Sequence, residues 1–200
     1  MPSRAVLATA LTVTILGSLF YLSSSSTSTF SPERLAHNMA SREYDASLPL
    51  SFTLSQISKS SPPSLLITLK NSSPDKTYTI LKWDTPLDPA ALHSGIFRIT
   101  NQATNKELDI PRLMLNRKLP PSKEDLEEIA PGTEHSVEVV LDKPWMPTEA
   151  AKYKVWVKGT FKGVREGSLA EVQDEVLEKA GGEGWQTGIF NSGSLVLEVE

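Results

Sequence analysis

Hydrophobic and polar residues alternate along most of the chain from residue 48 onward. Leu50, Phe52 and Leu54 alternate with serine and threonine, which is the period of a strand with one buried face. Similar alternation recurs between clusters of Pro, Gly, Asn, Asp and Ser, the residues that favour turns. The pattern predicts strands over residues 48–58, 65–70, 78–82, 96–101, 106–115, 134–141, 152–161 and 194–199.

Short strands at this spacing are typical of two antiparallel sheets packed face to face. We therefore expect residues 48–200 to form an all-β, immunoglobulin-like antiparallel β-sandwich of about seven to eight strands. Turn-forming residues at 71–75 predict a hairpin between the second and third strands. Those at 101–105 predict another hairpin between the fourth and fifth strands.

Two segments break the alternation and predict helices. Ser122 and Asp125 have the spacing of a capping box, which predicts a short helix ending near Ile129. Residues 168–180 have helical spacing and end at two glycines, so we expect a helical insertion in the sandwich there. The residues on its apolar face are Leu169, Val172, Val176 and Leu177.

The first 30 residues differ from the rest of the chain. Arg4 precedes an apolar run over residues 5–22, and a string of serines and threonines follows. These features predict a signal peptide, yet a run of about 18 residues is also close to the shortest N-terminal hydrophobic helix that spans a bilayer. Cleaved signal peptide and uncleaved signal anchor both remain open.

Either outcome places the domain that follows in the secretory pathway. The cleaved protein would be extracellular, whereas the anchored protein would hold its domain outside the cell or in the lumen. Membrane contact is expected only through residues 5–22, if these are retained. Residues 31–47 are polar and are expected to form a linker between this segment and the domain.

Charge and cysteine content exclude several classes of function. The chain has 20 Lys and Arg against 24 Asp and Glu, a net charge of −4, so nucleic acid is not an expected partner. There is no cysteine, which excludes disulfides, thiolate nucleophiles and cysteine metal sites. His37, His93 and His135 are scattered and form no His-Glu-x-x-His motif.

The sequence also contains no motif on which catalysis could rest. A Gly-x-Ser-x-Gly elbow, a glycine-rich phosphate loop and a dinucleotide fingerprint are all missing from the sequence. We therefore predict no catalytic residue, no metal ligand and no cofactor. The sequence indicates a protein that is not an enzyme.

Candidate partner contacts lie in two proline-rich loops, over residues 81–89 and 116–121. Tryptophan and arginine contribute disproportionately to binding energy when they are exposed, so we select Trp83, Asp84, Arg117 and Lys118. If Trp83 is buried instead, it is a core anchor. Asn71 begins an Asn-Ser-Ser sequon and is a candidate for N-glycosylation, although Pro74 follows directly.

An ordered series of segments resembles the N-terminal propeptide domain of fungal deuterolysins, which are secreted zinc metalloproteases. The segments are residues 71–75, 81–88, 112–121 and 129–132, followed by the strand at Tyr153. The resemblance implies a small β-sandwich over much of residues 48–160. The protease domain, with its His-Glu-x-x-His helix, and the cysteines of that family are absent, so no catalytic residue is carried over.

The resemblance implies a free-standing propeptide-like module that binds, assists or inhibits a partner. That partner would be a secreted protease or a cell-surface protein. Two alternatives stay open: a truncated or degenerate deuterolysin-type protease that lacks its catalytic domain, and a membrane-anchored structural surface protein. The second alternative depends on retention of residues 5–22.

Overall fold

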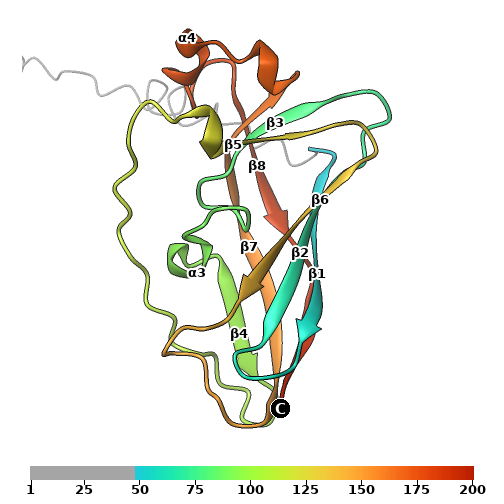
Figure 1. Cartoon of the computed structure of the whole chain (residues 1–200), viewed down its shortest axis with the longest axis vertical. Helices are drawn as coiled ribbons and strands as arrows, with labels where there is room; N and C mark the ends of the chain where they lie inside the picture. The colour runs from blue at the N-terminus through green and yellow to red at the C-terminus, as the bar shows by residue number, and fades with distance from the viewer. Residues whose placement is uncertain (1–47) are drawn as a thin grey trace, which may run out of the picture. The chain divides into compact units, whose positions relative to one another are not determined.

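The alternating segments form two antiparallel sheets in the computed structural model, which describes residues 48–200 (Figure 1). The smaller sheet has the strand order β1-β2-β6, with β1 at Leu50–Ser58, β2 at Ser64–Asn71 and β6 at Glu134–Val140. The larger sheet contains β3 (Tyr78–Leu81), β4 (Phe97–Asn101), β5 (Leu126–Ile129), β7 (Ala151–Glu166), β8 (Gln186–Asn191) and β9 (Leu195–Val199). The predicted all-β antiparallel sandwich is confirmed, with nine strands among the described residues.

Strand β7 organises the larger sheet because its 16 residues pair with four other strands. The first half of β7 lies between β4 and β9, and the second half lies between β3 and β8. Strand β5 then extends the sheet beyond β3. The side chains of Tyr153, Val155, Val157 and Phe161 are buried, so one strand supplies much of one wall of the core.

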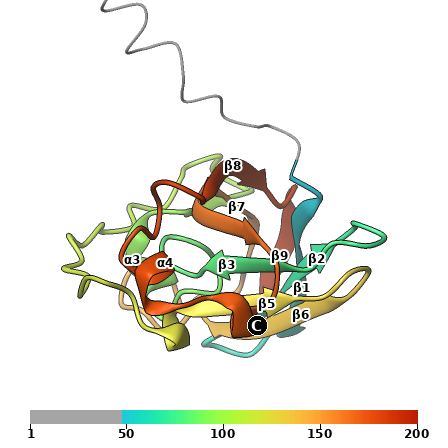
Figure 2. The same cartoon turned by 90° about the horizontal axis from the view of Figure 1, so that it is seen from above.

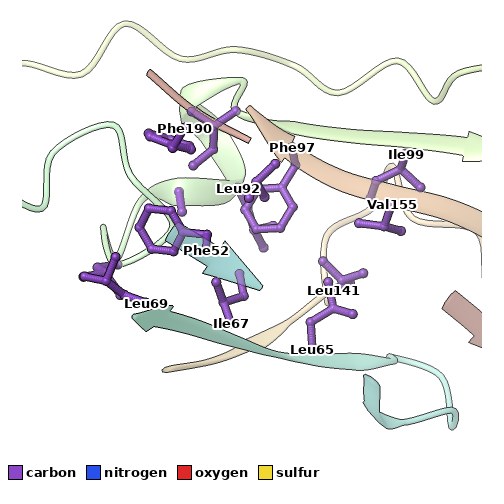
Figure 3. Close-up of a cluster of buried hydrophobic side chains, with 14 of the residues drawn as sticks. Phe52, Leu65, Ile67, Leu69, Leu92, Phe97, Ile99, Leu141, Val155 and Phe190 are labelled. Carbon is purple, nitrogen blue, oxygen red and sulfur yellow. The ribbon is translucent and has the colours of Figure 1, made fainter. Parts of the chain in front are cut away.

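The hydrophobic core fills the space between the two sheets (Figure 3). Phe52 of β1 stacks on Phe161 of β7 with ring centroids 5.6 Å apart, and Phe190 of β8 lies 5.1 Å from both rings. A Cβ atom on Gly159 would lie 2.6 Å from the Phe190 ring. Because Gly159 has no side chain, the Phe190 ring can occupy this space.

A side-chain bridge joins β1 to β9 and closes one side of the sandwich. The Gln56 side chain accepts a hydrogen bond from the Glu198 backbone N–H (2.9 Å) and donates one to the Glu198 backbone carbonyl (2.6 Å). The Gln56 amide thus pairs with the edge of β9 as a backbone group would. Lys59 and Lys152 both contact the Glu198 carboxylate at the same place.

Acid is expected to weaken this contact between β1 and β9, which we call the seam. Hydrogen bonds from Lys152 and Lys59 lower the pKa of Glu198 from 4.5 to about 2. Because the pKa is lower in the folded state, the ion pairs stabilise the fold above pH 4.5 and lose that effect as the pH falls toward 2. We expect the melting temperature to fall across this window, and to fall less in Glu198→Gln. Equal acid sensitivity in both proteins would contradict the prediction.

One of the two predicted hairpins is wrong, and the other forms only next to its turn. The turn at residues 71–75 carries the chain from β2 in the smaller sheet to β3 in the larger one, so these strands do not pair. Strand β4 pairs with β7. The turn at residues 101–105 forms as predicted, because the Asn101 N–H donates to the Lys106 carbonyl and the Leu108 N–H donates to the Ile99 carbonyl around a bridge between Thr100 and Glu107. Beyond Leu108 the segment is extended without a strand partner.

The predicted helices are shorter than expected. Lys123–Asp125 forms one 3-10 turn (η1) with the capping box in place, and the chain then enters β5, which was read as helix. The insertion consists of a 3-10 turn at Leu169–Glu171 (η2) and helix α4 at Asp174–Leu177, because the backbone between them is extended. One more short helix, α3 (Ala91–Ser94), lies before β4.

The predicted apolar face of the insertion is nevertheless correct. Its residues pack into a second, smaller core, the satellite cluster, whose buried members are Leu81, Leu126, Val172, Leu177 and Trp185. Gly181 has φ +76 and ends the segment as predicted. Figure 2 shows α3 and α4 on the side of the sandwich away from β1 and β2.

The segments predicted as signal peptide or anchor (1–30) and as linker (31–47) lie outside the described residues. Within residues 48–200, no helix has the length and apolar character needed to cross a membrane. All described residues belong to one compact unit.

Candidate functional site

The loop that leaves β3 is built around the carboxylate of Asp88, whose side chain is wholly buried. One oxygen of Asp88 accepts a hydrogen bond from the Asp84 backbone N–H (3.0 Å), and the other accepts one from the Ala90 N–H (2.9 Å). Asp84 has φ 58, in the left-handed region that aspartate tolerates better than most residues. The buried carboxylate therefore fixes the fold of residues 82–90.

Arg117 reaches the same carboxylate from a second loop. Its guanidinium contacts both oxygens of Asp88 and also lies over the ring of Trp83, with the Cζ atom 5.6 Å from the ring centroid. The Arg117 side chain is 25% exposed, so the pair is shielded on most sides. A bidentate arginine held between a carboxylate and an aromatic face has little freedom to move.

Trp83 links this loop to the start of β5. Its indole N–H donates to a carboxylate oxygen of Asp125 (3.0 Å), and its ring packs against the satellite cluster. Burial alone would raise the pKa of Asp125, but hydrogen bonds from Ser122 and Trp83, together with the charge of Lys82, lower it overall. Asp125 therefore remains ionised and holds the indole in place.

Residues 111–121, which we call the strap, run along the α3 side of the sandwich, within the connection between β4 and β5 (Figure 1). The Leu113 N–H donates to the His93 carbonyl (3.0 Å), and Arg112 donates to the Gly95 carbonyl (3.3 Å). Arg117 anchors the strap to Asp88. The strap exposes Leu113 (53%), Met114 (101%) and, beyond Arg117, Leu119 (73%).

The structure brings together two of the four predicted contact residues. Trp83 and Arg117 are in contact, and both are half-buried. Asp84 joins the same loop through its backbone, and Lys118 is exposed beside Arg117 on the strap. Trp83 is therefore partly a core anchor, as expected for the case in which it is buried. The exposed surface available to a partner comes mainly from the strap.

Sequence reasoning missed the residues that position this site. Asp88 was not selected, although an aspartate followed by proline commonly bonds to the backbone of its own turn. Asp125 was noticed only as a capping residue. Leu113 and Met114 were assigned to a strand, because their apolar character gave no sign that they lie on the surface.

Asn71, the predicted glycosylation site, lies in the core with 0% exposure. Its amide nitrogen donates to the carbonyls of Lys76, Ile129 and Ala130, and its oxygen accepts from the Ser73 N–H. These bonds tie the end of β2 to the end of β5. The folded domain leaves no space for a glycan on this nitrogen, so we expect Asn71 to be unmodified.

The described part of the chain contains no group of three residues that could hold a metal ion. His135 lies 3.0 Å from Glu127 and so links β6 to β5, while His93 lies in the last turn of α3. His37 lies outside the described residues. No arrangement of nucleophile, base and oxyanion donors was identified at the loop site, where the charged groups hold the loops together.

Asp88→Asn is expected to loosen the strap, because it removes the charge that holds Arg117. We expect the free energy of unfolding to fall by about 2 kcal/mol. Trypsin should cut the strap faster, since Arg112, Arg117 and Lys118 all lie within it. Asp109→Asn, at an exposed position just before the strap, is the control. Unchanged cleavage in Asp88→Asn would show that the ion pair does not hold the strap.

Two comparisons with known proteins bear on this chain. The family model of an immunoglobulin-like domain matches residues 49–199. A protein of Arthroderma benhamiae, described as an uncharacterized secreted protein, is 29% identical over 139 residues, which cover 68% of this chain and 69% of the relative. Neither comparison identifies a deuterolysin propeptide, so that resemblance stays a prediction.

Proposed function

Because the chain belongs to the immunoglobulin-like domain family, we propose that it is a noncatalytic binding module of the secretory pathway that engages a protein partner through its strap. Extracellular location is supported by the relative described as secreted and by the apolar run over residues 5–22. Folds of this kind serve many functions, so the proposal rests on the surface of this chain and not on the fold.

The observation that carries the proposal is the exposure of three large apolar side chains on an anchored loop. Leu113, Met114 and Leu119 are all more than half exposed. Exposed apolar groups that lie together commonly mark an interaction surface. The strap is held by Arg112, Leu113 and Arg117, so it would lose little conformational entropy when a partner binds.

The partner class that we propose is a secreted protease, with the chain acting as a propeptide acts on its enzyme. The resemblance of residues 71–132 to deuterolysin propeptides supports this choice. An immunoglobulin-like domain without catalytic motifs is consistent with a role as inhibitor or folding assistant. A cell-surface protein is the other partner that the sequence suggests.

The test measures inhibition and assisted refolding of deuterolysin-type zinc metalloproteases by the purified protein. We expect binding at micromolar concentration, weakened about tenfold or more when Met114 and Leu119 are both replaced by aspartate. Ile189→Asp, at an exposed apolar position on β8, is the matched control. If neither inhibition nor assisted refolding occurs, the protease partner is wrong.

A further inference from the structure

Strand β6 leaves one of its edges without a strand partner among the described residues. It ends the smaller sheet, where its other edge pairs with β2. The Asn71 N–H bonds to the Thr133 carbonyl, and the Leu141 N–H bonds to the Pro63 carbonyl. Because antiparallel pairs alternate, the odd-numbered residues of β6 bond to β2.

The even-numbered residues of β6 therefore direct their backbone groups toward the free edge. These are Glu134, Ser136, Glu138 and Val140, and all four side chains are exposed. The edge carries two glutamates and no basic residue, proline or bulge. Such an edge can accept an extended segment through backbone hydrogen bonds.

A groove of about 400 Å³ lies between β6 and the loop that precedes α3. Its walls include Leu87 and Leu92 on one side and Val137 and Val139 on the other. Asp142 and Lys143 also line the groove and pair with each other, whereas Glu138 lines it without an ion-pair partner within residues 48–200. An occupant would therefore need apolar side chains, a positive charge and free backbone groups.

The strap has all three properties. It carries Arg112, Arg117 and Lys118 and no acidic residue, and Lys118 has no ion-pair partner among the described residues. Met114 and Leu119 are exposed. Between residues 114 and 119 the structure shows no backbone hydrogen bond, so these N–H and carbonyl groups are free to pair with another chain.

The same free backbone groups argue against a membrane as the partner. A basic, apolar loop could in principle enter a lipid surface, but hydrocarbon offers no hydrogen-bond partners for an extended backbone. A strand edge offers those partners. The strap therefore fits a protein edge that is acidic and flanked by apolar side chains.

We propose that the strap of one copy of this chain pairs with the β6 edge of a second copy. The inference rests on the proposed function only in taking the strap as a binding surface, and it adds a second copy of this chain as a further partner beside the protease. Strap and groove meet at α3, where His93 bonds to Leu113 and also lines the groove. Two copies related by a two-fold axis can exchange straps reciprocally, each strap lying on the edge of the other copy.

The test is sedimentation of the protein purified after expression of the full chain, over a range of concentrations. We expect a dimer to form by about 0.1 mM, which is typical of a weak interface. Lys118→Glu and Glu138→Lys should each weaken dimerisation about tenfold, because each places like charges opposite one another. The double variant should recover most of the original affinity, since the charges are then exchanged.

Two further variants distinguish loss of the dimer interface from loss of the fold. Met114→Asp should abolish the dimer without changing the melting temperature, because Met114 makes no packing contact at 101% exposure. Ser136→Pro should also abolish the dimer, because it removes an N–H that faces the free edge, and should lower the melting temperature slightly, because it also removes the hydroxyl contact with Thr68. Ile189→Asp should leave the dimer intact.

A protein that stays monomeric at about 0.1 mM overturns the inference, and so does a double variant that fails to recover. A monomer that still binds a protease through the strap would overturn only the second copy as partner and would leave the proposed function standing. Dimerisation that survives Met114→Asp would place the interface elsewhere and would also overturn the inference.

Discussion

Replacing Asn71 with alanine is expected to lower the free energy of unfolding by about 3 kcal/mol. The alanine would remove the side-chain partner of the Lys76 and Ile129 carbonyls and of the Ser73 N–H. The Ala130 carbonyl would lose one partner but keep the Thr133 hydroxyl. A buried polar group without a partner is costly because it has lost its hydrogen bonds to water. Chemical denaturation of both proteins measures the difference.

Asn101→Ala is the matched control for this substitution. Asn101 also ends a strand and accepts hydrogen bonds from the Ala103 and Thr104 N–H groups, but those bonds are exposed. We expect it to cost about 1 kcal/mol or less. A similar loss in both variants would mean that burial does not add to the contribution of Asn71. The intact mass from a glycosylating host should show no glycan at Asn71.

Phe161→Ala is expected to have the largest effect, a loss of about 4 kcal/mol in the free energy of unfolding. Phe161 is fully buried and contacts both Phe52 and Phe190, so its removal leaves a cavity between the sheets. Its backbone partner is Gly188, which has no side chain that could fill the space. Thermal or chemical denaturation measures the loss.

The control for Phe161→Ala is Ile189→Ala on the neighbouring strand β8. Ile189 is 60% exposed, so its truncation removes little buried surface and should change stability by less than about 1 kcal/mol. If Phe161→Ala costs no more than this control, the aromatic group does not form the centre of the core.

The strands that could be predicted are those whose buried positions hold large apolar residues. β1 alternates Leu50 and Phe52 with polar residues, and its position was correct to within two residues. β8 was missed because Gly188 occupies a buried position, where it gives no hydrophobic signal. β5 was read as helix because its capping box is real, although the helix ends after one turn.

Strand pairing was harder to predict than strand position. The turn after Asn71 has the residues of a hairpin, but its end is fixed by hydrogen bonds to β5, which is more than 50 residues away in the sequence. A local turn signal contains no information about such a distant partner. The hairpin predicted after Asn71 failed for this reason, whereas the turn at residues 101–105, which is closed by neighbouring residues, formed as predicted.

Residue type was enough to select Trp83 and Arg117, which meet in the structure. It was not enough to find Asp88, because the importance of that carboxylate comes from burial and from the Arg117 side chain 29 residues later. The exposure of Met114 could not be predicted either, since a sequence does not show which apolar residues lack a packing neighbour.

The seam between β1 and β9 joins the first described strand to the last, through Gln56 and Glu198. During synthesis, β1 emerges long before the residues that close the sandwich on its side. At about 5–20 residues per second, many seconds pass before Glu198 can reach Gln56. During that time the apolar side chains of β1 remain exposed to solvent. A chaperone of the secretory pathway that shields β1 should therefore raise the yield of folded protein.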